Sequence, residues 1–119
     1  MQCENLEVWK RSCRLSVNVY KGFSTCKDFG FKDQITRSSL SIASNIAEGL
    51  EKASVKEKVR FIEIARGSTA ELITQIYIGI EIGYIEKKEG FSWVKEANEI
   101  SRMLHGLKKN YQTKQENRK

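Results

Sequence analysis

Apolar residues recur along most of this chain at intervals of three and four, the spacing that places side chains on one face of an α-helix. Short polar segments interrupt the pattern near residues 25–33, 48–54 and 84–90. The sequence contains no proline, a residue that breaks helices and is common in the turns of all-β proteins. These features predict an all-α protein with four helices and short connections.

The first predicted helix spans residues 5–24, with Asn5 as its candidate N-cap, and has two apolar strips on nearly opposite sides. One strip is Leu6, Trp9, Cys13, Val17 and Tyr20, and the other is Val8, Leu15 and Val19. A surface helix of a monomer needs only one apolar face. The second strip therefore predicts a further burial partner.

The second helix is predicted to begin at Phe31 or Asp33, after a turn in which Gly30 takes a left-handed backbone, and to end at Glu48, with Gly49 just beyond it. Its apolar face is Ile35, Ile42, Ile46 and Leu50, and its adjacent polar flank is Gln34, Ser38, Ser41, Asn45 and Glu48. Such a stripe of small polar side chains suits a close contact with another helix. We expect it to pack against the third helix at Gly67 and Ser68.

The third helix is predicted to start at a capping box, Ser54 with Glu57, and to run to Gly83. Its main apolar face is broad, and Ile64, Ile78 and Ile82 lie on a different side, around Glu71 and Gln75. Arg66 projects from the apolar side, where it needs a carboxylate partner, and Glu48 and Glu71 are the candidates. The residues expected to set helix contacts or an interface are Ser41, Asn45, Glu48, Gly49, Arg66, Gly67, Ser68 and Glu71.

The fourth helix has apolar residues that alternate at three and four positions, which is typical of bundle packing. They are Trp93, Ala97, Ile100, Leu104, Leu107 and Tyr111. Four helices with three short links predict an antiparallel up-down-up-down four-helix bundle. We expect one domain over residues 1–112 and a frayed basic tail over residues 113–119.

Candidate chemistry is sparse. His105 is the single histidine, and the three cysteines form no CxxC pair, so no nucleophilic or metal site is indicated. No glycine-rich phosphate loop is present. We therefore predict a protein that is not an enzyme and has no cofactor. The N-terminus lacks an apolar signal core and no uncharged run is long enough to cross a bilayer, which favours a cytoplasmic protein.

The net charge of +6 adds a second candidate activity, phosphate binding. Residues 108–119 contribute five cations and one carboxylate, so the other residues account for only +2. The candidate nucleic-acid contacts are Lys10, Arg11, Arg14, Lys21, Lys52, Lys56, Lys58, Arg60, Lys108 and Lys109. No exposed aromatic row indicates base stacking, so contacts would be electrostatic and weakly sequence-specific.

Two strings resemble a known family. SIASNIAEG over residues 41–49, and Gly67 and Ser68 followed by Glu71 and Leu72, resemble motifs of the small bacterial four-helix bundle proteins encoded in intervening sequences of 23S ribosomal RNA genes. The similarity extends from ENLEVWK near the N-terminus to ISRMLHGLKKN. This chain has Ala43 where the family usually has proline, which predicts a straighter second helix.

The resemblance implies an antiparallel bundle that assembles into a ring, typically a homopentamer. The same family includes the accessory variability protein of diversity-generating retroelements, whose ring binds a reverse transcriptase and nucleic acid through basic surfaces. The modest charge outside the tail fits the intervening-sequence members better. We expect a homo-oligomer with RNA or DNA as a candidate partner, and the alternative is a protein-interaction adaptor that binds no nucleic acid.

Overall fold

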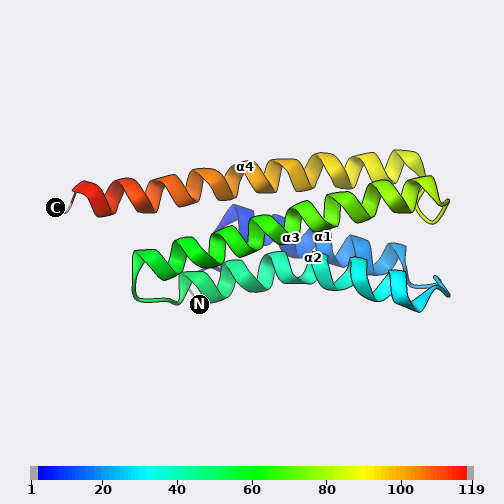
Figure 1. Cartoon of the computed structure of the whole chain (residues 1–119), viewed down its shortest axis with the longest axis horizontal. Helices are drawn as coiled ribbons and strands as arrows, with labels where there is room; N and C mark the ends of the chain where they lie inside the picture. The colour runs from blue at the N-terminus through cyan, green and yellow to red at the C-terminus, as the bar shows by residue number, and fades with distance from the viewer. Residues whose placement is uncertain (1–2, 118–119) are drawn as a thin grey trace.

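The chain folds as four long helices that alternate in direction (Figure 1). The computed structural model describes residues 3–117 and has helices α1 (Glu7–Gly22), α2 (Phe29–Leu50), α3 (Val55–Glu81) and α4 (Lys87–Asn117). They form an elongated body of 53 × 22 × 21 Å. The predicted up-down-up-down four-helix bundle is confirmed.

Each helix packs against two neighbours, in the order α1, α2, α3, α4 and back to α1. One apolar cluster fills the space between them, and the isoleucine face predicted for α2 lies fully inside it. On α1 the inner strip is Val8, Leu15 and Val19, whereas Val17 and Tyr20 of the other strip are exposed. Burial of the inner faces is the main stabilisation of helices this long.

The predicted start of the first helix is wrong. Leu6, not Asn5, occupies the N-cap position, and it makes no side-chain capping hydrogen bond. Residues 3–5 form a turn in which the backbone carbonyl of Cys3 accepts from the Leu6 N–H at 2.9 Å. Cys3 is buried in the core, so burial of this turn fixes where α1 begins.

The turn predicted over residues 25–33 is also shorter than expected, because Asp28 caps α2. Its Oδ1 accepts from the backbone N–H of Phe31 at 3.1 Å, which starts the helix at Phe29 and places Gly30 inside it. Among the described residues the glycine with a left-handed backbone is Gly83, with φ of 82°. The Ser54 cap is confirmed, since its Oγ accepts from the Glu57 N–H at 3.1 Å.

Helix α2 continues through Leu50, so Gly49 is not the residue after its end. Gly49 is buried against α3, where a β-carbon added to it would lie 2.7 Å from Cβ of Phe61. The glycine is therefore required by the close approach of two helices and not by a turn. Helix α2 also runs uninterrupted through Ala43, where a proline would remove a backbone hydrogen bond.

The small polar stripe of α2 does contact α3, as expected, but not at Gly67. Ser41 Oγ donates to Ser68 Oγ at 2.6 Å, and Ser38 Oγ donates to Gln75 Oε1 at 2.5 Å. Gly67 is exposed, and a β-carbon there would meet nothing within 4 Å, so the close crossing predicted at Gly67 is wrong.

Two further residues of the stripe, Asn45 and Glu48, make contacts within or next to their own helix. Asn45 Nδ2 donates to the carbonyl of Ser41 at 2.8 Å, and Glu48 lies 3.8 Å from Lys52 Nζ. Neither therefore bridges α2 and α3 through these contacts. Arg66 pairs with Glu63 at 3.0 Å, one turn away on α3, instead of with Glu48 or the exposed Glu71.

The last helix extends past the boundary predicted at residue 112. Residues 113–117 are helical and exposed, so the helix continues without core contacts to support it. In Figure 1 this end of α4 projects beyond the ends of α2 and α3. The rest of the predicted tail, residues 118–119, lies outside the described residues.

Candidate nucleic-acid interface

The outward face of α1 is a basic strip. Lys10, Arg14 and Lys21 are exposed, and with Val17 they occupy positions separated by four, three and four residues. Side chains at this spacing lie along one line of a helix. Lys10, Arg14 and Lys21 make no ion pair with another residue of the 3–117 range. Three of the cations predicted from the sequence therefore point together into solvent.

Helix α4 has a longer basic row. Lys88, Lys95, Arg102 and Lys109 are exposed and follow one another at intervals of seven residues. Seven residues complete nearly two helical turns, so the row drifts by only about 20° per step and places a cation roughly every 10 Å. None of these cations is ion-paired with a residue that the structure describes. Of this row, only Lys109 was among the candidate residues.

The strip on α1 and the row on α4 lie on the same side of the bundle, because the grooves between these helices are lined by both. Lys21 and Lys88 line a groove of about 710 Å³ whose floor includes Trp93. Arg14 and Lys95 line the adjoining groove of about 370 Å³. We call this surface, formed by Lys10, Arg14, Lys21, Lys88, Lys95, Arg102 and Lys109, the α1–α4 basic face.

Carboxylates also line these grooves. Glu86 and Glu89 lie in the larger groove with Lys21 and Lys88, and Glu96 and Glu99 lie in the smaller one. The groove floors therefore have mixed charge, and the unpaired cations at the rims and outward faces are the groups available to an incoming phosphate. Phosphate contacts of this kind position a nucleic acid without reading its sequence.

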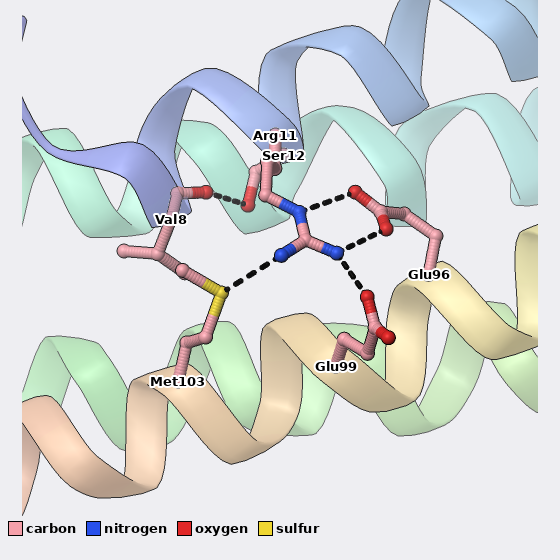
Figure 2. A network of polar contacts seen from close by, with 6 residues as sticks. All are labelled: Val8, Arg11, Ser12, Glu96, Glu99 and Met103. Carbon is pink, nitrogen blue, oxygen red and sulfur yellow. Dashed lines mark hydrogen bonds and ion pairs between the residues drawn. The ribbon is translucent and has the colours of Figure 1, made fainter.

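Arg11 is not part of the outward strip, although it was a candidate phosphate contact. Its side chain turns toward α4, as Figure 2 shows, where Nε donates to Glu96 Oε2 at 2.8 Å and Nη2 to Glu96 Oε1 at 2.5 Å. Nη2 also donates to Glu99 Oε2, and Nη1 contacts the Met103 sulfur at 3.5 Å. These partners use the donors that a phosphate would need.

The electrostatic consequences of this bridge are reciprocal. Hydrogen bonds to Glu96 and Glu99 raise the pKa of the Arg11 guanidinium above its usual value, and the bond from Arg11 lowers the pKa of Glu96. The side chains of Arg11 and Glu96 are each 30% exposed, so screening by solvent is incomplete. The bridge joins two neighbouring helices, α1 and α4, of which α1 is much the shorter.

The remaining predicted cations lie away from the α1–α4 basic face. Lys52 pairs with Glu48 at 3.8 Å and Arg60 with Glu57 at 3.5 Å. Lys58 donates to the Leu50 carbonyl at 2.9 Å, and Lys108 pairs with Glu63 at 3.2 Å. Lys56 is exposed at the start of α3. The structure thus divides the predicted cations into an outward group on α1 with Lys109, and a dispersed group that is mostly paired.

Residues 3–117 form neither a metal-ion site nor a helix that could cross a membrane. No cluster of His, Cys, Asp and Glu side chains in this range has the arrangement needed to hold a metal ion. Over the same residues, none of the helices combines the length and the apolar character that crossing a bilayer requires.

Comparison with known proteins identifies a family and a solved structure of similar fold. The family model of the 23S rRNA-intervening sequence proteins matches residues 4–106. The fold is similar to the crystal structure of a protein with unknown function from the S23 ribosomal protein family of Bacteroides thetaiotaomicron VPI-5482, with a TM-score of 0.80 and 26% identity, over 86% of this chain and 98% of that chain. Among curated proteins, no sequence matches this chain.

Proposed function

This chain belongs to the 23S rRNA-intervening sequence protein family, and from that premise we propose that it is a non-enzymatic, self-associating bundle that binds RNA or DNA through backbone phosphates. The α1–α4 basic face is the observation that carries the proposal. Its cations come from two adjacent helices, project outward and are not neutralised by described carboxylates. Unpaired cations release counterions from nucleic acid on binding, which is the main source of non-specific affinity.

The geometry of the α4 row favours a ligand with regularly repeated negative charge. Lys88, Lys95, Arg102 and Lys109 cover three steps of about 10 Å, or roughly 30 Å along the helix. A nucleic-acid backbone presents phosphates over that whole length, whereas a single small anion would engage only one step. Because lysine is a flexible point charge, the row tolerates different backbone geometries and gives affinity with little sequence preference.

Self-association is proposed from the apolar side chains that the single chain leaves exposed. Ile64, Ile78 and Ile82 on α3 are 39%, 48% and 50% exposed, and Val17 and Tyr20 on α1 and Leu40 on α2 are exposed to a similar degree. The three isoleucines share one side of α3, and an exposed apolar row of this kind marks an interaction site. A homo-oligomer, and a pentameric ring in particular, would cover these faces in each copy. The measured mass in gel-filtration light scattering tests this assignment directly.

The nucleic-acid proposal is tested by removing cations from the α4 row while keeping the ion-paired cations elsewhere in the chain. The triple variant Lys88→Gln, Lys95→Gln and Lys109→Gln should weaken binding to a structured ribosomal RNA fragment. Fluorescence anisotropy at about 50 to 300 mM salt should show the slope of log K against log salt falling by about one for each lost phosphate contact.

The matched control also removes three cations, but from the α2–α3 side. Arg37, Lys52 and Arg60 each pair with a carboxylate on the same or the next turn of chain. The variant Arg37→Gln, Lys52→Gln and Arg60→Gln has the same net charge as the test variant. Equal losses of affinity in the two variants would mean that net charge alone attracts RNA, and would exclude the α1–α4 basic face as the binding surface.

A second candidate function is a protein-interaction adaptor, which the exposed isoleucines of α3 favour. A partner such as a reverse transcriptase would dock on Ile64, Ile78 and Ile82. Such binding depends on apolar burial and should persist at about 300 mM salt, where phosphate-driven binding is greatly weakened. Replacement of Ile78 by aspartate should abolish adaptor binding while leaving the affinity for RNA unchanged.

A further inference from the structure

A pocket between α3 and α4 is lined almost entirely by hydrogen-bond donors. Arg66 comes from α3, and Asn98, Ser101, Arg102 and His105 come from successive turns of α4. The pocket has a volume of about 430 Å³, and no carboxylate is among its lining residues. It shares no lining residue with the two grooves between α1 and α4, which contain several carboxylates, and Arg102 is its one residue that also belongs to the α1–α4 basic face.

Arg66 has hydrogen-bonding capacity that the described residues do not satisfy. Its Nη1 donates to Glu63 at 3.0 Å, but its Nε is buried and has no acceptor among residues 3–117. A buried donor without a partner costs free energy, and a charged donor costs more than a neutral one. Because Nε is shielded from solvent, an acceptor in the pocket recovers that free energy when the Arg66 side chain rotates to present Nε to it.

The charge around the pocket is positive, even though a carboxylate lies close by. Burial favours the protonated form of Glu63, but hydrogen bonds from Arg66 and Lys108 outweigh it and lower the pKa of the carboxyl. Glu63 is thus shared by two cations, Arg66 at 3.0 Å and Lys108 at 3.2 Å, while Arg102 makes no ion pair with a described residue. Arg66, Lys108 and Arg102 thus bring three positive charges to this region against the one negative charge of Glu63, so the site retains an excess of positive charge.

From this geometry we infer that the α3–α4 pocket binds a phosphoryl group, held by Arg66 and Arg102 with Asn98, Ser101 and His105 completing its hydrogen bonds. Two guanidinium groups, an amide, a hydroxyl and an imidazole supply donors from two helices. A planar carboxylate is satisfied by one guanidinium, whereas the tetrahedral oxygens of a phosphoryl group accept from several directions.

The inference goes beyond the proposed function and does not depend on it, because the pocket is a discrete site for one phosphoryl group. That group is either a free phosphorylated small molecule or the terminal phosphate of a nucleic acid. The two sources are distinguished by the probes. Inorganic phosphate reports the pocket alone, and a ten-nucleotide RNA with and without a 5′-phosphate reports whether a strand end enters it.

The direct readout is the arginine Nε–H region of a ¹H–¹⁵N NMR spectrum of the full chain, recorded with phosphate or with chloride at equal ionic strength. The Arg66 and Arg102 signals should shift saturably with phosphate and not with chloride, and those of Arg14 and Arg37 should stay in place. Parallel shifts of all arginine signals would overturn the proposal, since they would show only general anion condensation on a basic protein.

Arg102→Gln is the primary variant, because Arg102 is exposed and its loss leaves the core intact. The loss of one charge-assisted hydrogen bond should weaken phosphate binding by about tenfold. The matched control Lys95→Gln removes one charge from the same helix outside the pocket and should change phosphate affinity by less than about twofold. Unchanged phosphate affinity in Arg102→Gln would refute the inference.

The test separates this inference from the proposed function. The triple variant Lys88→Gln, Lys95→Gln and Lys109→Gln leaves all five pocket residues in place, so it should lose RNA affinity and still bind inorganic phosphate. If the triple variant binds RNA normally while Arg102→Gln loses phosphate, the basic face is refuted and the pocket is supported. Stronger binding of the 5′-phosphorylated RNA, lost in Arg102→Gln, would identify a strand end as the source.

Discussion

The α2–α3 contact and the α1–α4 contact each hold two neighbouring helices together, but with different kinds of side chain. Between α2 and α3 the contact is made by small groups, with Ser41 bonded to Ser68 at 2.6 Å and Gly49 against Phe61. Between α1 and α4 it is made by long charged side chains, with Arg11 reaching two glutamates. Grooves lie beside both contacts: two of about 710 and 370 Å³ beside α1–α4, and one of about 370 Å³ beside α2–α3 that Ser41 and Ser68 line.

This difference also determines what each side of the bundle presents to solvent. On the α2–α3 side, Arg37 and Arg60 are neutralised by carboxylates four and three residues away on their own helix. On the α1–α4 side, one inward cation, Arg11, binds the nearest glutamates and leaves the outward cations unpaired. Arg11 therefore links α1 to α4, and the outward cations of these helices stay available to bind a ligand.

The largest effect is expected from adding a side chain where α2 and α3 approach closely at Gly49. In Gly49→Ala the new β-carbon would lie 2.7 Å from Cβ of Phe61, so the helices must shift apart. Overpacking of this kind costs about 1–3 kcal/mol, which outweighs the gain of about 1 kcal/mol from replacing glycine by alanine in a helix. Urea unfolding should show the loss as a lower transition midpoint.

Gly67→Ala is the matched control, because it makes the same chemical change at an exposed position of α3 with open space around it. Helix propensity alone should then raise the stability by about 0.4–1 kcal/mol. The two substitutions are thus expected to have opposite signs. A stabilised Gly49→Ala would show that α2 and α3 are not held at the separation seen in the structure.

A smaller loss of stability is expected from breaking the ion pairs between α1 and α4. Arg11→Met removes the guanidinium and leaves Glu96 and Glu99 partly buried without their partner. The cost should be about 1–2 kcal/mol, because hydrogen bonds to charged groups contribute more than neutral ones. The control Arg37→Met breaks an exposed pair within one helix and should cost less than about 0.5 kcal/mol. Equal losses in the two variants would mean that the bridge adds nothing to the α1–α4 contact.

The features that could be predicted from the sequence are those that depend on neighbours along the chain. The buried face of α2, Ile35, Ile42 and Ile46, follows from helical periodicity alone. The Ser54 cap follows from a motif four residues long. The row of cations on α4 could also have been predicted, since its members repeat every seven residues. Cations spaced that far apart do not stand out as a cluster in the sequence.

The features that could not be predicted depend on which helices become neighbours. Gly49 and Gly67 are both helical glycines, yet one is buried against Phe61 and the other faces solvent. The partner of Arg11 lies 85 residues away in the sequence, so no local pattern distinguishes Arg11 from the outward Arg14. In each case the sequence shows which residue is present, but only the packing of the helices determines whether that residue is buried, paired or exposed.

The smallest effect concerns pH and tests whether the bridge is ionic. The pKa of Glu96 is lowered in the folded state by the hydrogen bond from Arg11, from an ordinary value of 4.5. Below that value the unfolded chain binds more protons at this carboxyl than the folded chain does. The stabilisation is therefore complete above pH 4.5 and is lost as the pH falls through the lower folded-state pKa.

The difference in stability between the wild-type chain and Arg11→Met should consequently be largest at neutral pH and shrink toward pH 3. Thermal midpoints of both chains across that range measure it, with Arg37→Met as the exposed reference. Because other carboxyls titrate in both chains, only the difference between the two curves reports the bridge. A difference that stays constant with pH would mean that Arg11 supports α1 through the packing of its methylene groups and its Met103 contact. The contrast between an α2–α3 contact made by small side chains and an ionic α1–α4 contact would then fail.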